Sequence, residues 1–198
     1  MVESELVLRC GVSRVPLREA FRILAQEGLL DLSLHRGASV RPLSDLELRE
    51  LFGVRAAIEA FAVGAAARRR DVAVLAILRD IVRRMRQAVS RGQISIYRHL
   101  AAEFHEALVA AGNNDLLAGM YAQIRARLRR YQAAMSLVPH LPETSIAEHE
   151  AIIDAMQAGN AAAAIELTNA HLDSLVDQFA TPPSMPAKRN IAQSQLAD

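Results

Sequence analysis

The sequence predicts a mostly α-helical protein, in which a small helix-turn-helix with a β-hairpin precedes an antiparallel bundle of six helices. Three observations predict this fold class. Hydrophobic residues make up 52% of the 198 residues, which is enough for a buried core. From residue 44 to residue 180, apolar residues recur at helical spacing between short breaks. A pattern typical of strands is confined to a short stretch around Gly37.

Two short helices are predicted at the N-terminus. Residues Glu3 to Cys10 form the first, which Gly11 ends, and Ser13 is the expected N-cap of the second, whose first turn tolerates Pro16. One face of the second helix is expected to pack, and it consists of Val15, Ala20, Ile23 and Leu24. Another face is cationic, and it consists of Arg14, Arg18 and Arg22.

A β-hairpin is predicted after Gly28. Two short runs typical of strands, residues 29–34 and 38–40, flank the turn that contains Arg36 and Gly37. Helix, tight turn, helix and wing-like hairpin together are the organisation of a winged helix-turn-helix. We expect this unit to occupy residues 1–43.

Residues 44–180 are predicted to form the helical bundle. Ser44-Asp45-Leu46-Glu47 is typical of a capping box and opens a long amphipathic helix that runs to about Arg70. The later breaks predict about six helices in an antiparallel arrangement, and they lie at Asp71, Gly92, Gly112-Asn113, Pro139 to Pro142 and Gly159-Asn160. Residues 181–198 lack any periodicity and are expected to be a disordered tail.

Composition excludes several classes of protein. Charges interrupt the longest apolar stretches, so no membrane span is expected. The residues after Met1 lack the basic start and the apolar core of a secretory signal, which predicts a cytoplasmic protein. Because the formal net charge is only +1, any case for nucleic-acid binding must rest on local residues.

Two sets of motifs resemble one known family. The run from Gly11 to Ala20, followed by Leu24, Glu27-Gly28-Leu29 and Arg36-Gly37, closely resembles the DNA-binding domain of GntR-family transcriptional regulators. The helical part resembles the ligand domain of the FadR subfamily, the FCD domain, in its VanR-like, six-helix form. The residues that carry this second resemblance are Val54-Arg55, Glu59, Phe104-His105, Gly112-Asn113, Glu148-His149 and His171-Leu172.

The resemblance implies a homodimeric regulator that binds a palindromic double-stranded DNA operator, and not an enzyme. Arginines at the start of a recognition helix can pair with guanine in the major groove, while hydroxyl and wing residues contact phosphates or the minor groove. The DNA-binding candidates are Ser13, Arg14, Arg18, Arg36 and Gly37.

Family members carry one more helix ahead of the segment that begins here at Met1. The resemblance therefore implies that the first helix of the winged unit is missing from this sequence. Two explanations stay open, a misassigned start and a DNA-binding domain that has lost its function.

The metal-ligand candidates are three histidines that periodicity turns inward on three separate helices, His105, His149 and His171. A lone inward histidine is usually a core residue, but three in the family's order favour a shared pocket for Zn²⁺ or another divalent ion. The family's fourth ligand is an aspartate at the position of Ala101, so the site is expected to be weakened.

The expected effector is a small organic acid, bound through the metal or directly by the histidines and Arg55. An ion pair between Arg55 and Glu59 is the alternative for that arginine. Arg127 and Arg130 are further effector-binding candidates, with solvated surface as their alternative.

Two other functions stay open. The chain could be a ligand- or metal-binding helical module without DNA binding. It could also be a metal-dependent enzyme built on three histidines, which is weakened because no inward Glu, Cys or Lys is expected beside them.

Overall fold

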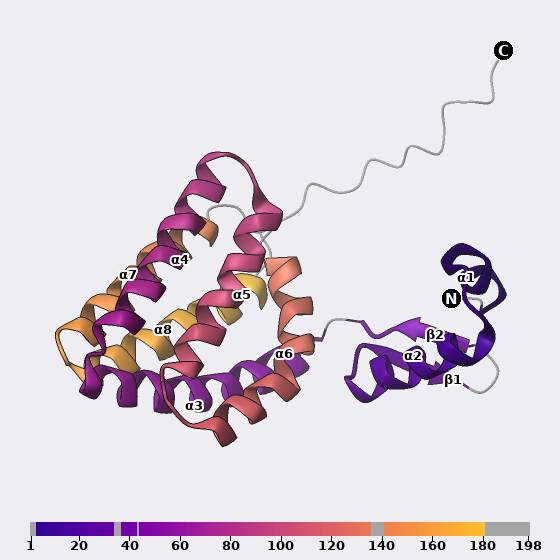
Figure 1. Ribbon diagram of the computed structural model, residues 1–198, viewed down its shortest axis with the longest axis horizontal. Helices are drawn as coiled ribbons and strands as arrows, with labels where there is room; N and C mark the ends of the chain where they lie inside the picture. The colour runs from indigo at the N-terminus through magenta and orange to yellow at the C-terminus, as the bar shows by residue number, and fades with distance from the viewer. Residues whose placement is uncertain (1–2, 34–36, 43, 136–140, 181–198) are drawn as a thin grey trace, which may run out of the picture.

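The computed structural model describes residues 3–33, 37–42, 44–135 and 141–180 (Figure 1). The N-terminal unit contains α1 (Glu3–Cys10), α2 (Arg14–Gln26), β1 (Leu30–Ser33) and β2 (Gly37–Val40). Six helices follow in the described ranges: α3 (Asp45–Arg69), α4 (Val72–Ser90), α5 (Ile94–Ala110), α6 (Asp115–Met135), α7 (Leu141–Gln157) and α8 (Ala161–Ala180). The predicted fold class is confirmed. Arg36 and the expected tail, residues 181–198, lie outside the described residues.

The N-terminal unit has a small core of its own. Strands β1 and β2 pair antiparallel, with Leu30 opposite Val40. The hairpin packs on α2 through a cluster of four buried residues, Leu17, Phe21, Leu30 and Ala38. None of the helices in the described ranges, here or in the bundle, is both long and apolar enough to cross a membrane.

The packing face expected for α2 is only partly right: Leu24 packs against the buried cluster, but Val15, Ala20 and Ile23 are exposed. Leu17 and Phe21 are buried, whereas Val15 is 78% exposed and Ile23 is 48% exposed. Each residue turns a helix by about 100°, so residues two apart point in nearly opposite directions, and burying Leu17 exposes Val15. The cationic face is exposed as expected, and it comprises Arg14, Arg18 and Arg22.

Gly28 joins α2 to the hairpin and contacts the bundle. Its φ of +72° lies in the left-handed region, which favours glycine. A Cβ at this position would also lie 2.4 Å from Nε of Arg127 on α6. The guanidinium of Arg127 therefore lies where a side chain at position 28 would be.

Helix α3 begins as predicted, but only half of the capping box forms. Oγ of Ser44 accepts a hydrogen bond from the Glu47 amide at 3.4 Å. The Ser44 amide donates to the Tyr131 hydroxyl at 3.0 Å instead of to the Glu47 carboxylate. That carboxylate lies 3.0 Å from the same hydroxyl. A tyrosine from α6 thus completes the cap, which sequence spacing around Ser44 cannot reveal.

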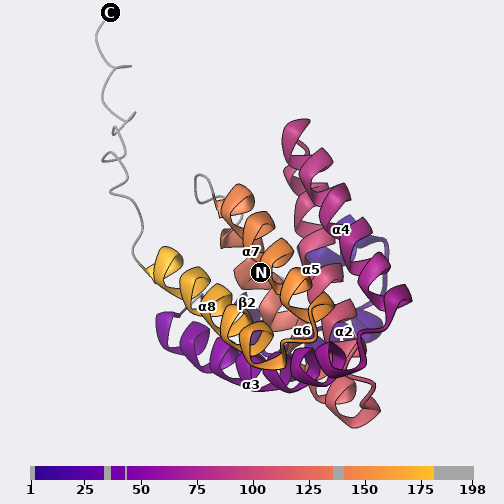
Figure 2. The ribbon, with the colours of Figure 1, turned by 90° about the vertical axis from the view of Figure 1, so that its left-hand side faces the viewer.

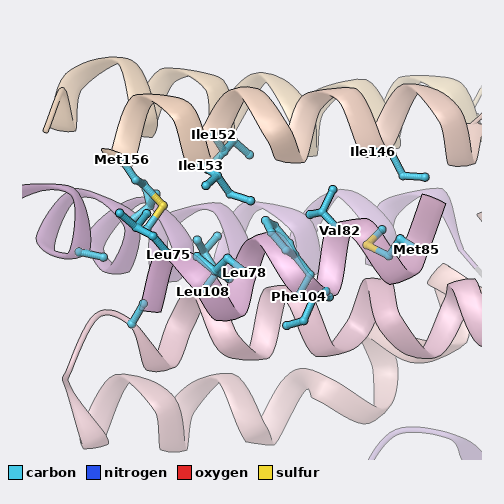
Figure 3. Packing of buried hydrophobic residues seen from close by; sticks show 14 of the residues in the cluster. Leu75, Leu78, Val82, Met85, Phe104, Leu108, Ile146, Ile152, Ile153 and Met156 are labelled. Atoms are coloured by element: carbon cyan, nitrogen blue, oxygen red, sulfur yellow. The ribbon is translucent and has the colours of Figure 1, made fainter. Parts of the chain in front are cut away.

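The bundle core brings α4, α5 and α7 together. Figure 3 shows Leu78 and Met85 of α4 beside Phe104 and Leu108 of α5, with Ile153 of α7 above them. On the other side, α3 packs most extensively on α8, and α7 also contacts α8 (Figure 2). Helices α3, α5, α7 and α8 therefore enclose a common interior.

Candidate functional site

Three histidines from three helices meet inside the bundle. His105 on α5, His149 on α7 and His171 on α8 are each at most 2% exposed. The ring centroids are 5.0 Å apart for His105 and His149, 5.4 Å for His105 and His171, and 4.6 Å for His149 and His171. One nitrogen of each ring lies within 4.8 Å of the other two. The inward orientation predicted for each histidine brings all three into one cluster.

A buried chain of charged groups orients His105. Nε of Arg55 donates to Oε1 of Glu59 at 2.7 Å, and Oε2 of Glu59 lies 2.9 Å from Nδ1 of His105. Both Arg55 and Glu59 are 0% exposed. Because the carboxylate accepts a hydrogen bond from Nδ1–H, Nε2 of His105 keeps its lone pair for the interior.

A second carboxylate orients His171. Oε2 of Glu148 lies 2.6 Å from Nδ1 of His171. Nε2 of His171 faces Nε2 of His149 at 3.2 Å, and Nδ1 of His149 is buried with no hydrogen-bond partner among the described residues. Phe104 stacks on the His149 ring with centroids 4.0 Å apart, which restrains that ring.

Burial keeps His105 and His149 neutral at physiological pH. Burial lowers the pKa of His105 to about 4, and the charge of Arg55 acts in the same direction. Burial also lowers the pKa of His149 well below its usual value. Burial alone would raise the pKa of Glu59, but Arg55 and His105 together lower it to about 2. Neutral imidazoles are the protonation state that a metal ion needs.

The residues present fit a divalent transition-metal ion. Three neutral imidazoles are a ligand set that Zn²⁺ accepts, with a further position left open. The carboxylates of Glu59 and Glu148 supply the outer hydrogen bonds that fix such ligands. The cavity against the histidines has a volume of about 30 Å³, and Ala101 also lines it. That volume has room for an ion with about one water molecule.

The expectation that no acid points inward beside the histidines is wrong. Glu59 is fully buried and touches His105. Its position on the same stripe of α3 as Arg55 was the available signal, but the spacing also suited a surface ion pair. Both oxygens of Glu59 are engaged and its pKa is low, so this acid orients His105 and is a poor general base.

The three arginines expected at the effector do not line the cavity. Arg55 forms the ion pair with Glu59 that was its alternative. Nε of Arg127 donates to the Glu27 carbonyl at 2.9 Å. Arg130 donates to the carbonyls of Gly28 and Pro42, each at 3.2 Å, and to the Glu47 carboxylate at 3.1 Å. The helical phase of α6 turns Arg127 and Arg130 toward the N-terminal unit. Local sequence could not reveal that contact.

Four polar residues of the cavity were not among the predicted site residues. They are Tyr97, Arg98, Gln132 and Ser145, which line it together with the histidines. Arg98 precedes His105 by seven residues, which is two helical turns, so its place on the inward stripe of α5 was a usable signal. Gln132 lies beside arginines and gave no such signal.

The cationic face of α2 carries the nucleic-acid candidates. Ser13 is the N-cap residue of α2, but its side chain forms no cap hydrogen bond. Arg14, the first residue of the helix, is exposed. Arg18 pairs with Glu3 of α1 at 3.1 Å. Gly37 begins β2 with a φ of +73°.

Comparison with known proteins points to transcriptional regulators. The family model of the FCD domain matches residues 50–174. A probable D-xylose utilization operon transcriptional repressor of Paenarthrobacter nicotinovorans is 30% identical, over 80% of this chain and 69% of its own. The HTH-type transcriptional repressor RspR of Escherichia coli is 28% identical, over 87% of this chain and 76% of its own.

Solved structures show the same fold. A GntR transcriptional regulator of Rhodococcus sp. RHA1 superposes with a TM-score of 0.77 at 23% identity, covering 91% of this chain and 86% of that chain. The relatives and the structural neighbours named here are regulators rather than enzymes.

The stability of the metal-free protein is expected to fall in mild acid. His105 has an ordinary value of 6.5 and a folded-state pKa of about 4, so below pH 6.5 the unfolded chain takes up a proton that the folded chain does not. Stability is therefore lost as the pH falls from 6.5 toward 4. By pH 4, this difference in proton uptake at His105 lowers the free energy of unfolding by on the order of 3 kcal/mol.

Thermal unfolding in a chelator between pH 7.5 and pH 4.5 measures this loss. His105→Gln keeps a donor for Glu59 and should flatten the dependence. His99→Gln, which removes an exposed histidine of the same helix, should leave it unchanged. Parallel curves for His105→Gln and the unsubstituted protein would contradict the protonation argument.

Replacing Ala101 by aspartate is expected to strengthen zinc binding. Ala101 lines the cavity one helical turn before His105, so a carboxylate there would join the three imidazoles. The gain should be about tenfold or more, because even outer hydrogen-bond partners change metal affinity by about 10–100-fold. Isothermal titration with Zn²⁺ measures it, with Ala101→Asn as the neutral control of the same shape. Equal affinities for the two variants would exclude a metal position next to Ala101.

Proposed function

We propose, from the premise that this chain belongs to the FCD-domain transcriptional regulators of the GntR family, that it couples operator binding to a small carboxylate effector. The metal in this proposal is Zn²⁺ or a similar divalent ion at His105, His149 and His171. The observation that carries it is the convergence of three buried imidazoles, two of which are oriented by carboxylates. Such an arrangement is costly in a protein core and is typical of a ligand site.

The proposed effector site is the histidine cluster together with the coordination position that its three imidazoles leave open. A bound divalent ion would act there as a Lewis acid for a carboxylate oxygen. The protein's own residues hold the rings: Glu59 accepts from His105, Glu148 accepts from His171, and Phe104 stacks on His149. Ala101 carries no carboxylate, so on that side of the cavity no protein anion would compete with the oxygen of the effector.

Operator binding is assigned to the exposed start of α2. The Ser13 hydroxyl is free of a cap bond, and the N-terminus of a helix favours contact with phosphate. Arg14 and Arg18 lie one helical turn apart on the same face of α2, so both can enter the major groove. The ion pair between Arg18 and Glu3 is exposed, so exchanging it for DNA costs no more than about 1 kcal/mol.

A second copy of the chain is the proposed partner of the bundle. Helices α3 and α6 pack against each other, and both carry large apolar side chains that are half exposed or more. These side chains are Val54 and Phe61 on α3, and Leu116 and Met120 on α6. Apolar surface of this kind supports a symmetric dimer interface. Two copies would present two α2 helices to a palindromic operator.

Three residues of α6 provide a physical link between the cavity and the DNA-binding unit. We call them the α6 clamp: Arg127, Arg130 and Tyr131. Arg127 and Arg130 donate to the carbonyls of Glu27, Gly28 and Pro42. Gln132, the next residue along α6, lines the histidine cavity. A ligand that moves α6 would therefore change the position or the freedom of α2, and the coupling would act in both directions.

Alanine substitution of Arg14 or Arg18 is expected to weaken operator binding by about 1 to 3 kcal/mol each. The loss should fall mainly on specific DNA, because base contacts and not only phosphate contacts are removed. Gel shifts with an operator selected from random DNA, and with unselected DNA of equal length, measure the two affinities. Arg22→Ala is the matched control, since Arg22 pairs with Glu19 farther along the same helix. Equal losses on both DNAs would argue against base recognition.

Removing the two clamp arginines is expected to uncouple the cavity from the operator. In the unsubstituted protein, operator affinity with zinc and with a chelator should differ by about 5–150-fold, the usual range for coupled sites. Arg127→Ala with Arg130→Ala should abolish this difference while zinc still binds. Arg125→Ala is the control on the same helix, because Arg125 pairs with Glu106 of α5 and makes no contact with the N-terminal unit among the ion pairs and hydrogen bonds of the described residues. Zinc dependence that survives in the clamp variant would refute this route.

A further inference from the structure

Arg98 of α5 lies at the mouth of the histidine cavity. It lines the cavity together with Ala101 and His105, which follow it on the same face of the helix. It also lines a neighbouring groove between α5 and α6, whose other walls are His99, Ala102, Arg129 and Gln132. Arg98 and Gln132 line both spaces, so the groove lies directly beside the cavity.

The guanidinium of Arg98 has no carboxylate partner among the described residues. The two acids of α5 itself are already engaged: Glu103 pairs with Arg84, and Glu106 pairs with Arg125 and Arg129. Glu148 is held by His171. A half-buried positive charge without a carboxylate partner among the described residues, at the entrance to a cluster of imidazoles, favours an anion.

The two spaces differ in size. The cavity against the histidines measures about 30 Å³, whereas the groove outside it measures about 200 Å³. An organic acid can therefore place only one small group at the histidines. The rest of the molecule must lie in the groove, against Arg98.

We propose that the effector is a dicarboxylate, with one carboxylate at the histidine cluster and the second bound by Arg98. This inference rests on the proposed function and adds the class of effector to it. A single guanidinium binds one planar carboxylate through two parallel hydrogen bonds and matches its single charge. Arg98 would thus distinguish dicarboxylates from monocarboxylates of the same length.

Isothermal titration of the zinc-loaded protein with acids of matched length tests the proposal. The probes are malonate, succinate, glutarate and adipate, each against the monocarboxylate with the same number of carbons. At least one dicarboxylate is expected to bind about tenfold or more tightly than its partner, as a hydrogen-bonded charge pair predicts. The chain length of the tightest acid then reports the span between the cluster and Arg98.

Variants separate Arg98 from the rest of the site. Arg98→Gln should remove the preference for dicarboxylates and keep the zinc content, and Arg98→Lys should restore part of the preference. Arg83→Gln, which removes a paired surface arginine of α4 and leaves Glu103 paired with Arg84, should behave as the unsubstituted protein. Unfolding curves check that each variant is folded.

The possible failures are distinct. A protein that takes up no zinc and binds none of the acids would refute the proposed function, and this inference with it. Equal binding of mono- and dicarboxylates, or a dicarboxylate preference that survives in Arg98→Gln, would overturn the role of Arg98 alone.

Discussion

The buried chain from Arg55 through Glu59 to His105 is the constraint on which the interior depends. It joins α3 to α5 through the 2.9 Å hydrogen bond between Glu59 and His105, while the 2.7 Å bond from Arg55 to Glu59 lies within α3 and neither residue has exposed surface. A buried ion pair contributes little net stability, but removing one partner leaves an uncompensated charge inside the protein. The chain therefore holds α3 and α5 in one register and sets the orientation of His105 at the same time.

Helix α6 imposes the second constraint, since it serves the bundle and the N-terminal unit at once. Tyr131 is buried in the bundle core, and its hydroxyl lies 3.0 Å from the Ser44 amide at the start of α3. Arg130 stacks on the Tyr131 ring at 5.4 Å and reaches back to the Gly28 carbonyl. Any shift of this part of α6 would disturb the cap of α3 and the turn after α2 together. A displacement of Gln132, the next residue of α6, would therefore reach both the cap of α3 and the turn after α2.

Periodicity predicted the bundle well because each long helix has one stripe that faces a common interior. The same reasoning turned His105, His149 and His171 inward, and the fold then brought them together. It failed for α2, a short helix that packs only on a hairpin, where Leu17 rather than Val15 is buried. It also could not assign Arg127 and Arg130, because their partners are backbone carbonyls about a hundred residues away in the chain. Contacts between units depend on the tertiary arrangement and leave little trace in local sequence.

The histidine cluster is an unfavourable choice for a core that only has to be stable. Burial depresses the pKa of His105 and His149, and Nδ1 of His149 lies buried without a hydrogen-bond partner among the described residues. An unsatisfied buried polar group costs about 1 to 3 kcal/mol, and aliphatic side chains of similar volume would avoid that cost. The surrounding core is mainly apolar and closely packed, with Phe104, Leu108 and Ile153 at most 1% exposed. Polar groups retained at such a cost, with carboxylates that fix two of the three rings, are better explained by a ligand than by packing.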